Sequence, residues 1–264
     1  MPRASVFPVE AGFKPVGPRR TFEGAVEQIA EQIRLGELAA GERLPSERDL
    51  AAAMQISRAT LREAARVLVG AGVLEVRSGS GGGMYVLSDY APLDLLRSMS
   101  DLRLDEVAGV LEARRLIEPR VAQLAAVRAT DEDYDELQRT IDAQRALIAR
   151  GDVLEAEDRF LALDTRFHLR IARASGNSTI VSLMRTLFRR LEIARDLALH
   201  EPPTASWVID VHERTLAAIR SADHARIEEV MDEHLAAMER SWELATDRPL
   251  VRPLPDFLRQ LAHS

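Results

Sequence analysis

The hydrophobic positions that follow residue 20 first take a helical spacing. Three- and four-residue steps relate most of the apolar side chains of this stretch, namely Phe22, Val26, Ile29, Ile33 and Leu38. Such a stripe predicts an amphipathic helix. Glycine favours the end of a helix, so Gly36 and then Gly41 are expected to terminate it.

Two short helices are predicted next. Ser46, with Asp49 three residues later, predicts the start of one helix, and Ser57 predicts the start of the second. The second helix has an apolar stripe of Leu61, Ala64, Ala65 and Leu68, followed by Gly70 and Gly72. A tight turn around Met54–Ile56 joins the pair, which is typical of a helix-turn-helix.

A β-hairpin is predicted directly after these helices. Val73–Arg77 and Met84–Leu87 are strand-like, and the segment between them, Ser78–Gly83, is almost entirely glycine and serine. A hairpin in this position is a wing, so residues 21–88 are expected to form a winged helix-turn-helix domain.

Amphipathic helical patterns fill the chain from about residue 91 onward. They cover roughly 104–128, 131–150, 153–174, 177–199, 204–220 and 223–246, with no strand pattern and no fixed-period repeat. We therefore expect a mainly α protein, with an all-α antiparallel helical bundle at 93–246. The proline-containing ends, 1–20 and 247–264, are expected to be a flexible arm and an irregular tail.

Composition narrows the classes of protein that this chain can be. It has 264 residues, no cysteine, no apolar run long enough to span a membrane and no signal-peptide pattern, which favours a cytoplasmic protein without disulfides. The net charge of −7 is uneven, because residues 1–88 carry 11 basic against 10 acidic side chains and the remainder 24 against 32. A nearly neutral first domain remains compatible with DNA binding, since local placement of charge decides phosphate attraction.

The second helix of the helix-turn-helix has the residues of a DNA-reading element. Arg58 and Arg62 lie four apart and share the face opposite the apolar stripe. A major groove admits such a helix with its first turns at the base edges. The residues predicted to contact double-stranded DNA are Arg48, Ser57, Arg58, Thr60, Arg62, and in the wing Arg77 and Gly79. The alternative is a small helical domain with ordinary surface arginines.

The same segment resembles a known family. G-E-L-A-A-G-E-R-L-P-S-E-R-D-L-A, then I-S-R-A-T-L-R-E-A, then a glycine-rich wing ending M-Y-V, is similar to the winged helix of GntR-family bacterial transcription regulators. The resemblance covers about residues 22–87. It implies DNA contacts at Arg48, Arg58, Thr60, Arg62 and Gly79. Ala59 stands where relatives often have a hydroxyl residue, so one polar contact is absent here.

Histidines in the predicted bundle suggest a metal site. Asp164 and His168 are at i and i+4 on one helix, so both side chains project from one face. His212 and His234 are each flanked by core-type residues, which points them to the bundle interior. One aspartate and three histidines suit Zn, Ni, Co or Mn better than Ca or Mg. The alternative is that each histidine is an ordinary hydrogen-bonded residue, as we expect for His200, His224 and His263.

The helical part resembles the FCD ligand-binding domain of FadR-subfamily GntR regulators. The similar segments are 111–126, 164–168, 174–177, 212–219 and 233–235. The resemblance implies a divalent metal, zinc first, held by Asp164, His168, His212 and His234. It also implies a small carboxylic acid effector beside the metal, with Arg114 and Asn177 as effector-binding residues. Their alternative roles are a surface ion pair for Arg114 and a helix N-cap for Asn177, and for Asn177 we favour the cap.

These features together favour a DNA-binding transcription regulator rather than an enzyme. The resemblance and the geometry of DNA sites imply a homodimer on a pseudo-palindromic operator, acting as a repressor that the effector releases. The linker Ser88–Leu96 is expected to be the joint between the domains. Two alternatives stay open, a sensor of the metal alone and a metalloenzyme with an accessory winged helix. Against the enzyme, Glu213 and Glu233 adjoin metal ligands in sequence but are expected to point elsewhere.

Overall fold

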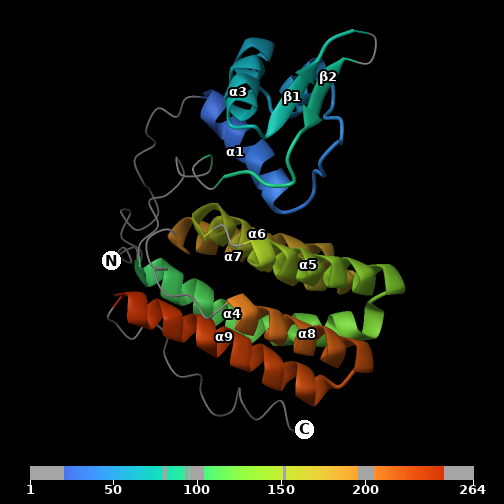
Figure 1. Ribbon diagram of the computed structural model, residues 1–264, viewed down its shortest axis with the longest axis vertical. Helices are drawn as coiled ribbons and strands as arrows, with labels where there is room; N and C mark the ends of the chain where they lie inside the picture. The colour runs from blue at the N-terminus through green and yellow to red at the C-terminus, as the bar shows by residue number, and fades with distance from the viewer. Residues whose placement is uncertain are drawn as a thin grey trace, which may run out of the picture.

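The computed structural model describes residues 21–79, 82–92, Leu95, 104–150, 153–195 and 205–246. The predicted arm 1–20, the predicted tail 247–264, and His200 and His263 lie outside the described residues. Within them, the chain forms a small winged helix followed by a larger helical bundle (Figure 1).

The winged helix begins with three helices, α1 (Thr21–Arg34), α2 (Glu47–Ala53) and α3 (Arg58–Gly70). Both predicted N-caps are confirmed, since the Ser46 hydroxyl accepts a hydrogen bond from the Asp49 backbone N–H and Ser57 accepts one from Thr60. The predicted apolar stripe of α3 is fully buried against α1. The opposite face of α3 is thereby left in solvent.

Helix α1 ends earlier than its apolar stripe indicated. The last helical residue is Arg34, because Gly36 adopts a left-handed conformation with φ of 70° and reverses the chain. Its backbone N–H donates to the Ile33 carbonyl at 3.0 Å. Leu38 therefore lies beyond the helix, although it still packs against the core of the winged helix.

The wing is an antiparallel pair, β1 (Leu74–Arg77) and β2 (Gly83–Val86), with Leu74 opposite Val86. Residues 41–44 run along the other edge of β2, where the Leu44 N–H donates to the Met84 carbonyl at 2.9 Å. The hairpin predicted from sequence is confirmed, and its base is tied to the segment before α2.

Six helices make up the described part of the bundle. They are α4 (Leu104–Arg128), α5 (Asp131–Arg150), α6 (Val153–Ala174), α7 (Ser178–Arg195), α8 (Ala205–Ser221) and α9 (His224–Thr246). Helices α5, α6 and α7 form the layer nearer the winged helix, and α4, α8 and α9 form the layer beyond it (Figure 1). Among the described residues no strand occurs in this part, as the sequence predicts.

Local sequence explains where these helices begin. Thr130, Asn177 and Asp223 each stand just before a helix and accept or exchange hydrogen bonds with its first turn. Large apolar side chains from α4 to α9, such as Phe167, Phe188 and Ile219, then form one continuous core between the two layers. In the part of the chain that the structure describes, no helix is both long and apolar enough to cross a membrane.

Candidate metal centre and DNA-binding surface

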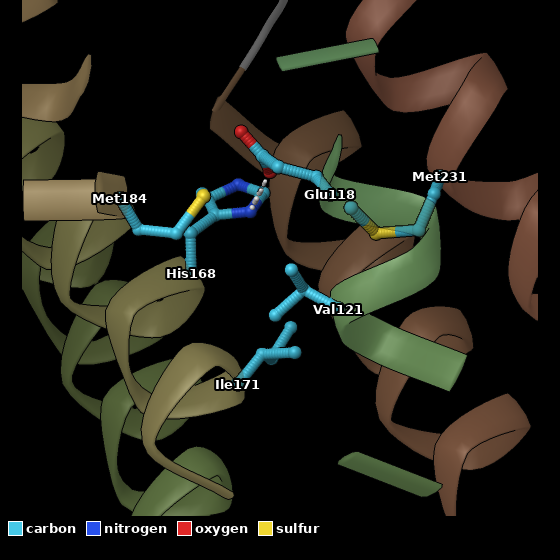
Figure 2. A pocket seen from close by; sticks show the side chains of 6 residues that line it. All are labelled: Glu118, Val121, His168, Ile171, Met184 and Met231. Carbon is cyan, nitrogen blue, oxygen red and sulfur yellow. Dashed lines mark ion pairs between the residues drawn. The ribbon is translucent and has the colours of Figure 1, made fainter. Parts of the chain in front are cut away.

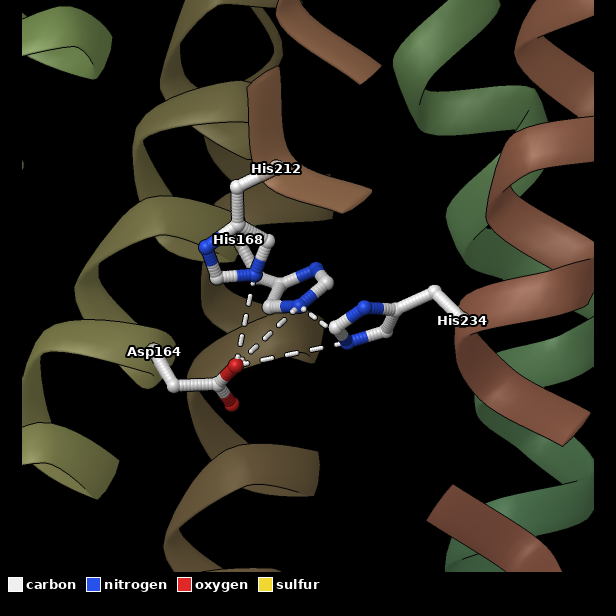
Figure 3. Close-up of side chains that lie close together, drawn as sticks. All are labelled: Asp164, His168, His212 and His234. Atoms are coloured by element: carbon white, nitrogen blue, oxygen red, sulfur yellow. Dashed lines mark hydrogen bonds and ion pairs between the residues drawn. The ribbon is translucent and has the colours of Figure 1, made fainter. Parts of the chain in front are cut away.

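Four side chains from three helices meet in the middle of the bundle. Asp164 and His168 come from α6, His212 from α8 and His234 from α9, and all four are at most 4% exposed. Figure 3 shows the three imidazole rings turned toward the Asp164 carboxylate. The structure thus brings together the four residues that the sequence singled out.

The separations in this cluster suit one small cation. Asp164 Oδ1 lies 3.3 Å from His212 Nε2 and 4.0 Å from the Nε2 atoms of His168 and His234. The Nε2 atoms of His168 and His234 are 3.2 Å apart. Tetrahedral ligand atoms at about 2.0–2.2 Å from one ion lie about 3.3–3.6 Å apart. The cluster is therefore close to the size that a divalent ion requires.

The protonation of the histidines also suits a cation. Burial lowers the pKa of His212, and burial together with the neighbouring rings of His168 and His212 lowers the pKa of His234 well below its ordinary value. Neutral imidazoles offer lone pairs to a metal. His212 Nε2 and His234 Nδ1 are buried without a well-formed hydrogen bond. A cation bound at the Nε2 atoms would supply the partner that His212 Nε2 lacks.

Two buried residues support the histidines from behind. His168 Nδ1 lies 2.7 Å from Glu118 Oε2, and His212 Nδ1 lies 2.9 Å from Gln144 Oε1. The His212–Gln144 contact is a hydrogen bond, and an acceptor on Nδ1 fixes the tautomer in which Nε2 carries the lone pair. The His168–Glu118 contact is a close ion pair without hydrogen-bond geometry. The sequence analysis missed both Glu118 and Gln144, because they belong to α4 and α5 and only packing brings them to the histidines.

Arg114 is buried rather than at the surface. Its side chain is fully buried in α4, pairs with Glu118 and places its guanidinium 4.7 Å from the centre of the Phe188 ring. The alternative of a surface ion pair is therefore corrected, since the pair exists but lies in the core. Burial alone would raise the pKa of Glu118, yet Arg114 and His168 lower it to about 2. One guanidinium nitrogen, Nη2, is buried with no hydrogen-bond partner.

A narrow pocket lies beside the Glu118–His168 pair (Figure 2). Its lining consists of Glu118, Val121, His168, Ile171, Met184 and Met231. The space is too narrow for a water-sized molecule, so a larger ligand requires side chains to move. The flexible thioether chains of Met184 and Met231 adapt more readily than branched residues.

Asn177 stands at the start of α7. Its side-chain oxygen accepts hydrogen bonds from the backbone N–H groups of Thr179 and Ile180, at 3.0 and 3.2 Å. This is the N-cap that we favoured for Asn177. A role in effector binding remains a prediction for this residue.

Exposed surfaces of α2 and α3 present the arginines predicted to read DNA. The side chains of Arg48, Arg58 and Arg62 are 82%, 60% and 55% exposed. Glu47, the first residue of α2, lies 2.9 Å from Arg62 Nε and 3.5 Å from Arg58 Nη2 through one carboxylate oxygen. Both arginines are therefore gathered at the N-terminal end of α3 by a carboxylate that the sequence analysis did not consider.

The remaining predicted DNA contacts lie on the same domain. The Ser57 and Thr60 hydroxyls are 2.8 Å apart at the start of α3. In the wing, Arg77 pairs with Glu75 and its guanidinium lies 4.0 Å from the centre of the Tyr85 ring. Gly79 has a φ of 97°, a conformation that side chains other than glycine rarely adopt.

Comparison with known proteins now identifies the family. A model described as "Bacterial regulatory proteins, gntR family" matches residues 21–84, and one described as "FCD domain" matches residues 109–237. The Putative L-lactate dehydrogenase operon regulatory protein of Escherichia coli K12 is 32% identical over 227 residues, covering 83% of this chain and 85% of that protein. The chain belongs to the GntR family.

Further relatives of this GntR-family regulator carry similar descriptions. The HTH-type transcriptional repressor NanR of E. coli K12 DH10B is 28% identical over 236 residues, covering 87% of each chain. A solved structure titled "Streptococcus agalactiae GntR" is 28% identical with a TM-score of 0.46, covering 83% of this chain and 99% of that one. Family and relatives are transcription regulators, so the chain is a DNA-binding regulator and not an enzyme.

The acidic residues next to the candidate metal ligands agree with that assignment. Glu213 pairs with Arg145, and Glu233 pairs with Arg214 at 2.7 Å, both on partly exposed surfaces of the bundle. Neither carboxylate points toward the cluster, as the sequence analysis expected, so neither can act as a base there.

The buried histidines predict how stability changes with pH. In metal-free protein, the unfolding free energy is expected to fall as the pH drops below about 6.5, the ordinary histidine pKa. The reason is that the pKa values of His212 and His234 are lower in the folded state, so the unfolded state binds more protons in this window. Urea titrations in EDTA between about pH 7.5 and 5.5 measure this dependence.

A matched control separates the buried histidines from the exposed one. His224→Ala removes a surface imidazole outside the cluster and is expected to retain the same pH dependence. A stability that stays flat or rises on acidification would contradict the folded-state protonation inferred here.

Proposed function

We propose that this GntR-family protein is a repressor whose operator affinity is set by a small carboxylic acid bound beside a divalent metal. The observation that carries the proposal is the convergence of Asp164, His168, His212 and His234 in the core of a domain attached to a winged helix. A buried cluster of this kind fits a sensing site, because its occupancy changes how three helices are held together.

The metal in this proposal is held by those four side chains, with zinc first and nickel, cobalt or manganese as alternatives. A bound divalent ion supplies a Lewis acid to which an effector carboxylate can coordinate. Gln144 holds the ring of His212 in the required tautomer, and Glu118 forms a close ion pair with His168.

Arg114 is the residue proposed to receive the effector carboxylate. Its Nη2 atom is buried and lacks a hydrogen-bond partner, which is costly for a guanidinium unless a ligand completes it. Arg114 is also close enough to His234 to lower its pKa. A relative is named for an L-lactate dehydrogenase operon, and lactate is a small carboxylate. Asn177 remains a further proposed contact, although its carboxamide caps α7.

DNA binding in this proposal uses the exposed face of α3 and the wing. We propose that two copies related by a two-fold axis bind a pseudo-palindromic operator in the cytoplasm, where the chromosome lies. Arg58 and Arg62 supply the base contacts, with Arg48, Ser57, Thr60, Arg77 and Gly79 around them. Repression is the sign proposed here, as in the name of the relative NanR.

A second candidate function is a sensor of the metal alone. The observation in its favour is the pocket beside His168, which is too narrow for a water-sized molecule. The two functions differ in whether a carboxylic acid stabilises the metal-loaded protein further.

A thermal-shift screen of small carboxylic acids on zinc-loaded protein tests the proposal. An effector at about 100 times its Kd stabilises the folded state by about 2.7 kcal/mol. His212→Ala, used as the control, is expected to lose that response. Stabilisation by zinc alone, with no acid adding to it, would overturn the effector and favour the metal sensor.

Specific DNA binding is expected to depend on the two arginines of α3. Arg58→Ala or Arg62→Ala should weaken cognate binding by about 1–3 kcal/mol, because a bidentate arginine–guanine contact discriminates by that amount. Folding should be little affected, since their contacts with Glu47 are exposed ion pairs. Competition binding with selected and scrambled duplexes measures the effect.

Arg66→Ala is the matched control, because Arg66 is an exposed arginine two turns beyond Arg58 on the same helix. It should keep the ratio of cognate to scrambled affinity. If both test variants kept full specific affinity, α3 would not be the reading element.

A further inference from the structure

Opposite faces of helix α6 carry the candidate metal ligands and a row of arginines. One carries Asp164 and His168. The other carries Arg159, Arg166 and Arg173 at seven-residue spacing, and we call these three residues the docking face. Arg166 is two residues from Asp164 and two residues from His168, which places it about 160° around the helix from both. All three arginines contact the winged helix or the segment after it.

Arg166 caps the C-terminal end of α1. Its Nε donates to the Arg34 carbonyl at 2.6 Å, and its Nη2 donates to the Ile33 carbonyl at 2.7 Å. The last carbonyls of a helix lack partners within it and carry partial negative charge, so a guanidinium there is favourable.

The two residues after Arg34, Leu35 and Gly36, allow the end of α1 to approach α6 closely. Gly36 has a φ of 70°, and a side chain there would begin 3.4 Å from Arg166 Nε. The preceding residue, Leu35, is 3% exposed and belongs to the hydrophobic core of the bundle. The end of α1 is thus inserted into the helical domain, with an apolar anchor beside a polar cap.

A buried ion pair adds a second contact between the end of α1 and helix α6. Arg34 is 1% exposed and forms two hydrogen bonds with the Asp158 carboxylate of α6, at 2.7 and 3.1 Å. The same arginine donates to the Ala91 carbonyl at 2.7 Å, and the Tyr90 hydroxyl also bonds to Asp158. Since charges are costly to bury unless their geometry is satisfied, this pairing favours one relative orientation of the two domains.

We propose that the docking face of α6 holds the DNA-binding domain in a fixed orientation, and that metal bound on the opposite face strengthens this docking. The inference rests on the proposed metal site. Two of its four ligands are on α6 and the others on α8 and α9, so a bound ion fixes α6 within the bundle. The contacts of Arg166, Arg34 and Leu35 then fix the position of the winged helix relative to α6. Metal and docking are then coupled, and the coupling is reciprocal.

Distance measurements between spin labels test this coupling in the full chain. The chain has no cysteine, so Ala52→Cys in α2 and Ala143→Cys in α5, both exposed, give one labelled pair in each copy, and mixing with excess unlabelled protein keeps labelled copies apart in a dimer. Adding Zn²⁺ to the metal-free protein is expected to convert a broad distance distribution into a narrow one. Arg166→Ala should at least halve the narrow fraction in Zn²⁺ while titration calorimetry still shows metal bound.

Two further variants make the outcome decisive. Arg170→Ala removes an arginine of α6 that pairs with Glu136 of α5, and it should retain the narrow distribution. Gly36→Ala disturbs the contact between the end of α1 and Arg166, and it should broaden the distance distribution as Arg166→Ala does. The coupling alone is overturned if Arg166→Ala and Gly36→Ala both keep a narrow distance distribution. It is also overturned if Zn²⁺ binds the parent without changing the distribution. Absence of Zn²⁺ binding, or equal narrowing in His212→Ala, overturns the metal site as well.

Discussion

Replacing His212 by alanine is expected to lower the Zn²⁺ affinity of the purified protein by more than about 100-fold. Loss of an outer partner of a metal ligand typically costs about 10–100-fold, and His212 is itself one of the four proposed ligands. Its Nε2 is the nitrogen nearest to Asp164, at 3.3 Å, so its removal opens one side of the cluster. Titration calorimetry against a competing chelator measures the change.

The exposed His224 provides the control for that experiment. It begins α9, the helix that carries His234, but lies outside the cluster. His224→Ala should bind Zn²⁺ as the parent does. Equal affinity in His212→Ala and the parent would show that the ion, if bound, is held elsewhere.

Glu118→Leu is expected to lower the unfolding free energy by about 3–5 kcal/mol. The reason is that Arg114 is fully buried and loses its anionic partner, which leaves an uncompensated charge in the core. The same change removes the carboxylate 2.7 Å from His168 Nδ1, so Zn²⁺ affinity should fall about 10–100-fold. Urea unfolding in EDTA and a metal titration separate the two effects.

A double variant distinguishes charge burial from packing. Arg114→Met with Glu118→Leu replaces the whole pair by apolar side chains, which is often neutral or stabilising. Stability should return while Zn²⁺ affinity stays low. If the double variant were as unstable as Glu118→Leu, the defect would come from packing around α4 rather than from the charge of Arg114.

The fold was largely predictable because its periodicity is local. The buried stripe of α3 and the bounds of α4, α5 and α6 follow from spacing and capping residues within each segment. Gly36 was also expected to end α1, and only the stripe residue Leu38 falls outside the helix, because the left-handed Gly36 has already reversed the chain.

The site was predictable only for residues with a distinctive chemistry. A histidine among apolar neighbours is unusual enough to be noticed, and so His168, His212 and His234 were found. Glu118 and Gln144 look like ordinary polar helix residues, and only the packing of α4 and α5 against the cluster gives them a role. The docking face was missed for the same reason, because arginines at seven-residue spacing resemble a solvated helix surface.

The position of Glu47 has a consequence for how the protein searches a chromosome. Any duplex that engages Arg62 must first draw it away from a carboxylate 2.9 Å from its Nε. A guanine edge offers two acceptors in a plane that matches the guanidinium, whereas a lone acceptor offers less than the carboxylate it displaces. If Arg62 contacts bases as proposed, we expect competition from Glu47 to lower the affinity for weak sites more than the affinity for sites with a guanine edge.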